Sequence, residues 1–423
     1  MKEDSFLRRL YKSFGPGFIT GAADDDPSGI GTYSQTGAQF GFSQLWTAPF
    51  SFPFMLAVQE MCGRIGLVTG QGLASVIKTH YSKKVLWAAV IVLLITNTIN
   101  IGADLGAMAA ALQLIVPGSF IFLLLTITSF MLVVEIIVPY PTYARFLKYL
   151  AISLLAYVAT ALLIKQDWSH VAYATLVPHI ELSKSYLLNI AAILGTTISP
   201  YLFFWQADEE VEEEIATHKV KDMNTGAPLV QKSDITRMRW STTMGMFFSQ
   251  LIMFFIVLTV GATLYTNGIH TIETAQDAAL ALRPFAGDLA FFLFAIGIVG
   301  TGLLAVPVLA GSAAYALAET FGWEEGLGKK YSQAPGFYGI IIVATLVGLL
   351  VNLSPIGPMQ MLYYSAVLNG LLAPPLLILI LLISNNKKIL GTHTNGRLSN
   401  VLGIAITLIM GAVAVALLVS FLG

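Results

Sequence analysis

The fold is decided by the stretch Gly17-Phe18-Ile19-Thr20-Gly21-Ala22-Ala23-Asp24-Asp25-Asp26-Pro27-Ser28-Gly29-Ile30-Gly31, an apolar segment interrupted by carboxylates and a proline. A second interrupted segment reads Ala191-Ala192-Ile193-Leu194-Gly195-Thr196-Thr197-Ile198-Ser199-Pro200-Tyr201-Leu202-Phe203. Pro27 lies on the first membrane-length segment and Pro200 on the sixth. Segments broken by Gly or Pro at corresponding positions of two halves indicate the substrate site of an inverted-repeat transporter. The carboxylates at the first break favour a cation as substrate.

The composition is that of a polytopic membrane protein. Of 423 residues, 56% are hydrophobic and only 11% are charged, and the mean hydropathy is +0.74. A soluble domain carries about twice that charged fraction. Cys62 is the only cysteine, which excludes an intrachain disulfide and a thiolate metal cluster. No nucleophile–base constellation or phosphate-binding loop occurs, so we expect neither an enzyme nor a bound cofactor.

Eleven apolar segments are long enough to cross a membrane at ~20 residues each. With the N-terminus in the cytoplasm, only Lys165, Lys184 and Arg283 of the 23 Lys and Arg residues fall outside. This strong positive-inside bias predicts an integral protein of the plasma (inner) membrane with a cytoplasmic N-terminus and an external C-terminus. The segments lie near residues 15–40, 43–63, 85–116, 119–138, 146–164, 187–207, 240–264, 286–317, 337–352, 359–384 and 400–421.

The first ten segments divide into two sets of five within one transmembrane domain, residues 1–423. Since five is odd, a second repeat over 187–384 has the opposite topology to a first repeat over 15–165. Segment 400–421 is then an additional helix. The charged stretch 208–239 reads as a solvated helix end plus a flexible loop, and a cation vestibule is the alternative interpretation.

Proline chemistry places unpaired oxygens at the two breaks. A proline has no N–H and collides with the carbonyl four residues earlier, so Pro27 frees the carbonyl of Ala23 and Pro200 frees that of Thr196. Such carbonyls are costly in a membrane unless they face a cavity or an ion. With nearby side-chain oxygens they form a hard ligand set suited to Mg²⁺, Ca²⁺ or Mn²⁺. The side-chain members are Asp26, Ser28 and Ser199.

Each of these features also has a purely structural interpretation. A proline in a membrane helix is more often a simple kink than a site. Asp24, Asp25 and Asp26 cannot all face one ligand, because neighbours on a helix point about 100° apart. Asp26, next to the break, is the best ligand candidate, and Asp24 or Asp25 is expected to bond the scaffold or line the entrance. Gly29 and Gly31 predict further unwinding after Pro27.

The two breaks resemble those of the Nramp family of divalent-metal transporters. The phrase Gly15-Pro16-Gly17-Phe18 ahead of Asp26-Pro27 is similar to the family's lead-in to its first broken helix. This resemblance implies an all-α LeuT-type fold with eleven transmembrane helices, broken helices 1 and 6, and alternating access. It also implies Asp26 and the carbonyls of Ala23 and Thr196 as metal ligands. Gly29 then occupies the family's Asn position, and Ser199 its Met position.

The departures from the family pattern change the expected substrate. Ser199 removes a soft thioether that discriminates for Mn²⁺, Fe²⁺ and Cd²⁺. Asn100 and Ala103 replace acidic proton-path residues, with Asp104 displaced by one position and facing elsewhere. Tyr201 replaces a histidine after the proline. Small residues, among them Ala366 at a coordinating Gln position, leave room for a hydrated ion. The pattern therefore resembles the Nramp-related magnesium transporters, which carry Mg²⁺ and also Mn²⁺, here without proton coupling.

Three other functions remain open from the sequence. One is a proton-coupled Mn²⁺/Fe²⁺ transporter of the main Nramp type, and another is a sodium-coupled symporter of organic solutes. A third, of another class, is a non-transporting metal receptor or membrane scaffold. The expected partners are divalent cations as substrate and the lipid bilayer, with no nucleic acid and no obligatory protein partner.

Overall fold

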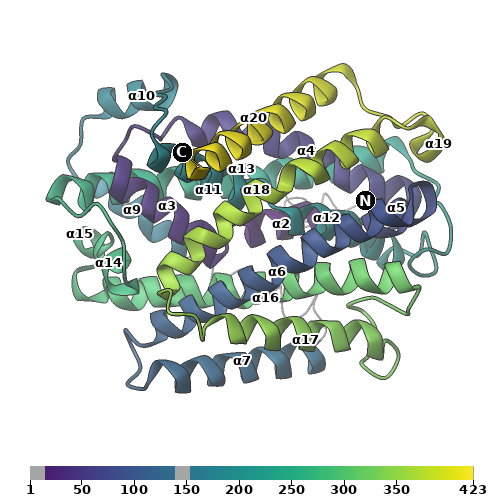
Figure 1. The fold of residues 1–423 in the computed structure, drawn as a ribbon, viewed down its shortest axis with the longest axis horizontal. Coiled ribbons are helices and arrows are strands. Elements are labelled where there is room, and N and C mark those ends of the chain that lie inside the picture. Colours follow the sequence, from purple (N-terminus) through teal and green to yellow (C-terminus); the bar gives the residue numbers. More distant parts are fainter. Residues whose placement is uncertain (1–14, 139–152, 423) are drawn as a thin grey trace, which may run out of the picture.

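The computed structural model describes residues 15–138 and 153–422, which form helices and their connections (Figure 1). Several helices begin at a serine whose hydroxyl accepts a backbone N–H of the first turn, as Ser82, Ser119 and Ser183 do. Others begin with proline in the first turn, where its missing N–H costs no intrahelical bond. Local capping and apolar composition therefore account for most helix starts.

The helices are α2 (Pro16–Asp24), α3 (Pro27–Phe40), α4 (Thr47–Thr69), α5 (Leu73–His80), α6 (Lys83–Leu112), α7 (Phe120–Ile137), α9 (Leu155–Leu163), α10 (Trp168–Leu176), α11 (Lys184–Thr197), α12 (Pro200–Ala216), α13 (Lys232–Thr263), α14 (Ala275–Leu280), α15 (Arg283–Ala286), α16 (Ala290–Phe321), α17 (Pro335–Val351), α18 (Pro358–Ser384), α19 (Lys387–Leu390) and α20 (Arg397–Leu422). Two short 3₁₀ turns, Tyr265–Asn267 and Gly287–Leu289, complete them.

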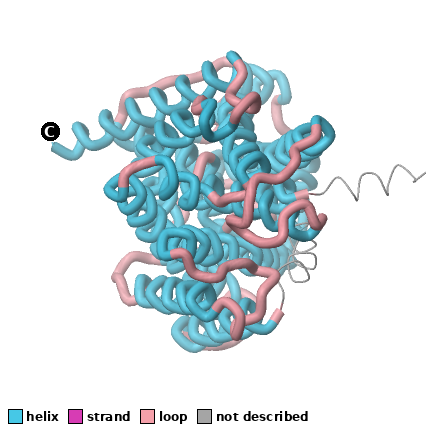
Figure 2. The backbone as a smooth tube through the Cα atoms, turned by 90° about the vertical axis from the view of Figure 1, so that its right-hand side faces the viewer, coloured by secondary structure: helices cyan, strands magenta, loops and turns pink. Residues whose placement is uncertain are grey.

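The short helices α2, α3, α11 and α12 lie inside the bundle. Helix α13 packs along both α2 and α3, α18 packs along α11, and α6 contacts α16, α17 and α18. Helices α7 and α17 lie along one side of the bundle and α20 along the opposite side (Figure 1). Figure 2, turned by 90°, views many of these helices end-on. The interrupted helices are therefore shielded by uninterrupted ones.

Both predicted breaks are confirmed. Helix α2 ends at Asp24 and α3 begins at Pro27, while α11 ends at Thr197 and α12 begins at Pro200. The expected further unwinding at Gly29 and Gly31 is wrong, because both lie within α3. Asp26 caps α3 and Pro27 occupies its first position, so the helix starts at once.

Each predicted span contains a helix, although residues 146–152 of the fifth span lie outside the described residues. Among the described residues, seven helical segments are long and apolar enough to cross a membrane, and α17 is a shorter apolar helix. The total of eleven crossings, and the division into repeats at 15–165 and 187–384, stay predictions.

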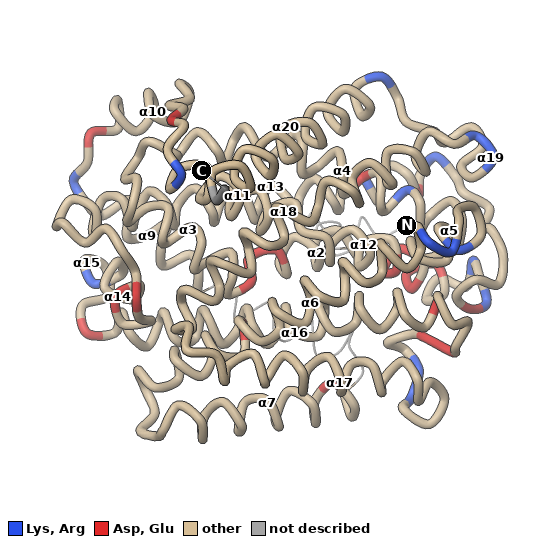
Figure 3. Tube along the Cα trace, in the orientation of Figure 1, with Lys and Arg blue, Asp and Glu red and all other residues tan. Residues whose placement is uncertain are grey.

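The interpretation of 208–239 as a solvated helix end is wrong for its first third. Helix α12 continues to Ala216 and packs against α4 and α16, so that Asp208, Glu210 and Glu214 are buried. Figure 3 shows most Lys and Arg gathered where α5 and α19 lie, with a few at the other end near α15. We call the end with α5 and α19 the basic end. The acidic half of α12 lies at this end.

Candidate metal site at the helix breaks

Asp26 occupies the first break and is 1% exposed. Its Oδ1 accepts the backbone N–H of Gly29 at 2.6 Å and the hydroxyl of Ser28 at 2.7 Å. Asp–Pro is a helix-start signal, because Asp caps the free N–H groups and Pro needs no partner for its nitrogen. The same local chemistry that ends α2 therefore fixes one carboxyl oxygen of Asp26 on α3.

The second carboxyl oxygen of Asp26 faces other helices. Oδ2 accepts from Asn100 Nδ2 of α6 at 3.2 Å and from the Tyr201 hydroxyl of α12 at 3.5 Å. Three helices, α3, α6 and α12, thus meet at one buried carboxylate. Both donors are neutral groups, so neither offsets the negative charge that an ionised Asp26 offers to a cation.

The two carbonyls that the prolines release both accept protein hydroxyls in this structure. Tyr201 donates its hydroxyl to the carbonyl of Ala23 at 3.0 Å. Ser199 donates to the carbonyls of Gly195 at 2.5 Å and Thr196 at 3.0 Å. A buried carbonyl must find a donor, so these hydroxyls satisfy the broken helix ends.

Gly29 lies between the two breaks. A Cβ added to it would lie 3.1 Å from the Asp24 carbonyl oxygen, 3.3 Å from Thr196 Oγ1 and 3.4 Å from Asp26 Oδ1. The structure thus brings Asp26, Ser28 and Gly29 beside Thr196. Any side chain at this position would occupy the space between the Asp26 carboxylate and α11.

Asp24 and Asp25 bond the scaffold. The hydroxyl of Ser249, on α13, donates to the Asp24 carboxylate and, at 3.4 Å, to Asp25 Oδ1. The expectation that one of these carboxylates would hydrogen-bond a neighbouring helix is confirmed. Among the hydrogen bonds of the described residues, Asp26 is the one of the three carboxylates that bonds residues of both α3 and α12.

Two asparagines of α6 lie on one helix face, as their sequence spacing predicts, and have different partners. Asn97 donates to the Leu309 carbonyl at 2.8 Å and to Ser312 Oγ at 2.7 Å, which joins α6 to α16. Asn100 donates to Asp26. The one-residue offset of Asp104 does not take it away from the break: its fully buried carboxyl lies near Asp26 and Ser28, and neither of its oxygens has a hydrogen-bond partner among the described residues.

Ala366 packs beside α11. It belongs to a small apolar cluster with Ala191, Ala192, Val367 and Leu417, between α11, α18 and α20. Its backbone packs against Gly195 of α11, whereas Gly29 is the small residue next to the Asp26 carboxylate. Tyr201 is the residue whose contacts the sequence did not reveal, since family resemblance marks it only as a replaced histidine. Its position directly after Pro200 is the signal that points to the break.

Asp26 is the only carboxylate among the six candidate ligands. Within the described parts of the chain, no group of three or more His, Cys, Asp or Glu side chains could hold a metal ion. A cation at the breaks would therefore depend on carbonyls, hydroxyls and water besides Asp26. Such a ligand set consists of hard oxygen atoms, and its one negative charge is that of Asp26.

Comparison with known proteins identifies the family. The family model described as "Natural resistance-associated macrophage protein-like" matches residues 17–420. The chain belongs to the Nramp family. It is 24% identical over 430 residues to "Divalent metal cation transporter MntH" of Yersinia pestis (strain Pestoides F), covering 98% of this chain and 97% of the relative. The relative of the same name from Caldanaerobacter subterraneus is 25% identical over 320 residues, or 72% and 71% of the two chains.

Solved structures share the fold of this Nramp protein. A crystal structure of the Eremococcus coleocola manganese transporter superposes with a TM-score of 0.73 at 17% identity, covering 99% of this chain and 88% of that one. Mhp1, a nucleobase-cation-symport-1 family transporter, gives a TM-score of 0.62 at 15% identity, with 96% and 90% covered. The predicted all-α LeuT-type fold is confirmed.

Proposed function

We propose that this chain carries Mg²⁺ and Mn²⁺ across a membrane by alternating access, with the ion bound between the two helix breaks. The observation that carries this proposal is Asp26, a buried carboxylate placed where both broken helices meet and surrounded by oxygen and amide groups. The relatives from Yersinia pestis and Caldanaerobacter subterraneus are named divalent metal cation transporters, which supports the same class of substrate.

The proposed ligand set is Asp26 with the carbonyls of Ala23 and Thr196, supplemented by Ser28, Ser199 and the space at Gly29. On binding, the ion displaces the hydroxyl of Tyr201 from one carbonyl and that of Ser199 from the other. Mg²⁺ prefers six oxygens at about 2.0–2.1 Å and releases water reluctantly. Several of its ligands are therefore water, and the absence of a thioether favours hard ions.

We propose that transport moves no protons. The polar groups that contact Asp26 Oδ2 are Asn100 and Tyr201, neither of which exchanges a proton readily near neutral pH. An inward-negative potential is sufficient to drive entry, since it contributes about 2.3 kcal/mol per charge per 100 mV, and twice that for a divalent ion.

The arrangement in the membrane is part of the proposal. The basic end faces the cytoplasm by the positive-inside rule, which places the N-terminus inside and the C-terminus outside the plasma (inner) membrane. The two repeats, 15–165 and 187–384, rock about the fixed site, and the last helix is an addition.

A second candidate is a proton-coupled Mn²⁺ transporter. Asp104 favours it, because this buried and unpartnered carboxyl lies near Asp26, and a carboxyl at membrane depth is a standard element of proton relays. Protonation of Asp104 during the transport cycle would supply the coupling.

Reconstituted protein in liposomes separates the two candidates. Mg²⁺ or Mn²⁺ influx is recorded together with lumenal pH while a potential is imposed. We expect influx that follows the potential, an unchanged lumenal pH, and no influx in Asp26→Ala, with the exposed Asp288→Ala as matched control. Acidification that tracks uptake and vanishes in Asp104→Asn would establish the proton-coupled alternative. Binding without any influx would indicate a receptor.

A further inference from the structure

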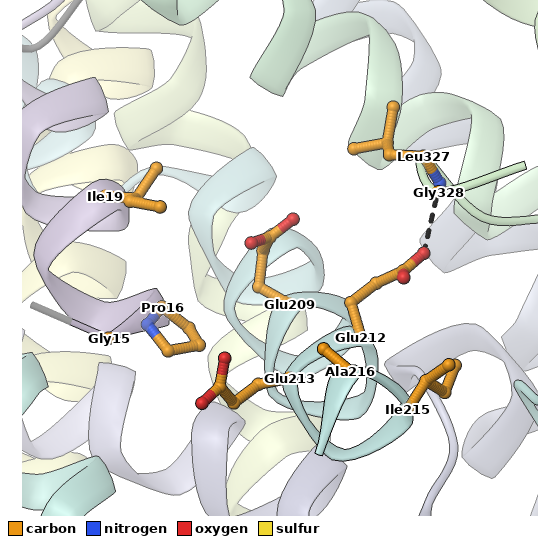
Figure 4. A pocket seen from close by; sticks show the side chains of 10 residues that line it. All are labelled: Gly15, Pro16, Ile19, Glu209, Glu212, Glu213, Ile215, Ala216, Leu327 and Gly328. Atoms are coloured by element: carbon orange, nitrogen blue, oxygen red, sulfur yellow. Dashed lines mark hydrogen bonds between the residues drawn. The ribbon is translucent and has the colours of Figure 1, made fainter. Parts of the chain in front are cut away.

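A cavity of about 340 Å³ opens at the basic end, between the start of α2, the acidic half of α12 and the segment at Leu327–Gly328. Figure 4 shows three glutamates of α12, namely Glu209, Glu212 and Glu213, extending into it. Their spacing of three and four residues places them on one helix face. We call these three residues with their cavity the glutamate vestibule.

Two of the three glutamates are held by the protein. Glu212 Oε1 accepts the hydroxyl of Tyr315 at 2.6 Å and the backbone N–H of Leu327 at 3.1 Å. Glu213 pairs with Arg237 at 3.3 Å, and both of these side chains are about one-third exposed. This ion pair is therefore weakened by water and leaves Glu213 available to other cations.

Glu209 has no such partner. It is 8% exposed, and no hydrogen bond or ion pair holds its carboxylate within the described residues. Its nearest charges are the other carboxylates Glu210, Glu212 and Glu213. A nearly buried carboxylate among like charges either takes up a proton or is stabilised by a cation. The cavity in front of Glu209 is where such a cation fits.

We propose that the glutamate vestibule binds a hydrated divalent cation, as a second site on the transport route. The inference rests on the proposed function, in which the basic end faces the cytoplasm. No group of three carboxylate, His or Cys side chains in the described chain closes on a metal directly, so the ion keeps its water shell. Six waters occupy about 180 Å³ at ~30 Å³ each, which the cavity accommodates.

Helix α2 runs from the vestibule to the central break. Pro16 and Ile19 line the cavity, and the same helix ends at Asp24, beside the break. A hydrated ion held by carboxylates exchanges readily, because no direct metal–oxygen bond has to break. The vestibule therefore collects or releases ions at the cytoplasmic mouth while Asp26 holds the transported ion.

The test measures binding of Mn²⁺ by electron paramagnetic resonance to the full chain in nanodiscs, in an Asp26→Asn background that removes the central site. We expect one remaining site, from which cobalt(III) hexammine, an inert analogue of a hexahydrated cation, displaces Mn²⁺. Adding Glu209→Gln should weaken Mn²⁺ binding by about tenfold. Glu273→Gln, an exposed glutamate at the opposite end, should leave it unchanged.

A second variant excludes a folding artefact. Arg237→Gln frees Glu213 and should tighten Mn²⁺ binding by about two- to threefold, a change in the direction opposite to any loss of structure. Undiminished binding in Glu209→Gln, or failure of cobalt(III) hexammine to compete, would overturn the vestibule proposal. Failure of the proposed function is measured separately, as absence of influx in the unmodified protein.

Discussion

At the scale of single residues, the two carboxyl oxygens of Asp26 have different contacts. Oδ1 caps α3 and Oδ2 faces α6 and α12. An N-cap contributes about 1 kcal/mol to a helix, and the same carboxylate can accept a cation through its other oxygen. The helix-capping role and the proposed cation-binding role of Asp26 are therefore compatible, because they use different carboxyl oxygens.

Ser199 is expected to set the selectivity. Its hydroxyl bonds the last carbonyls of α11, and Ser199→Met would replace it by a thioether that favours soft ions. Competition of Cd²⁺ or Mn²⁺ against Mg²⁺ uptake should increase several-fold, measured as the half-inhibitory concentration. Ser199→Ala, which adds no sulfur, is the control. An unchanged ratio in Ser199→Met would show that position 199 does not face the ion.

Tyr201 is expected to compete with the ion for the Ala23 carbonyl. Its hydroxyl occupies that oxygen at 3.0 Å, and a net hydrogen bond contributes about 1 kcal/mol. Tyr201→Phe should therefore lower the KM for Mg²⁺ uptake by about fivefold. Tyr364→Phe, at a position that is 47% exposed, should have no effect. A raised KM in Tyr201→Phe would mean that the hydroxyl itself binds the hydrated ion.

At the scale of helices, the first half of each broken helix packs backbone to backbone against an unbroken one. A Cβ at Gly21 of α2 would lie 2.2 Å from the carbonyl carbon of Gly245 in α13. At Gly195 of α11, a Cβ would lie 2.0 Å from the Ala366 carbonyl oxygen in α18. Small residues allow such close approach in membranes, where packing replaces the hydrophobic effect.

Gly21→Ala tests this packing for α2. The added methyl group has only backbone to displace, and overpacking of this kind costs about 1–3 kcal/mol. We expect a thermal midpoint lowered by several degrees and a several-fold slower uptake, measured on purified protein and in liposomes. Gly339→Ala is the matched control, since no atom lies within 4 Å of a Cβ there. Equal behaviour of the two variants would contradict a close α2–α13 contact.

At the scale of the whole molecule, Glu325 connects two loops that are distant in sequence. It is 3% exposed and its Oε1 accepts from Asn224 Nδ2 at 2.8 Å. Burial, and then the nearby Glu319 carboxylate, raise the pKa of Glu325 from 4.5 to about 10. The folded protein thus holds this proton more tightly than the unfolded chain, so stability declines as pH rises between these two values.

Glu325→Gln removes this dependence, because glutamine does not titrate. The variant should have a higher thermal midpoint than the parent at about pH 9, with the difference shrinking toward about pH 5. The measurement is a series of thermal scans across pH on detergent-solubilised protein. A parent and variant with parallel pH profiles would show that Glu325 is already ionised in the folded state.

The sequence by itself determined the helix breaks and the membrane class. Pro27 and Pro200 act on the four residues before them, and Asp26 caps the helix that Pro27 starts, so these features follow from local covalent chemistry. Hydropathy likewise depends only on composition within a span, which is why every predicted span contains a helix. The position of the Asp26 carboxylate at a break therefore follows from the residues on either side of it.

Only the tertiary structure decided which groups meet. Tyr201 reaches the Ala23 carbonyl across 178 positions of sequence, and Ser249 reaches Asp24 across 225. It also buried Asp208, Glu210 and Glu214 of α12, which local charge alone would leave solvated, because α12 packs against α4 and α16. Such contacts depend on how helices rotate and approach one another. The rotation and approach of the helices are determined by the packing of the whole bundle, and no local stretch of sequence encodes them.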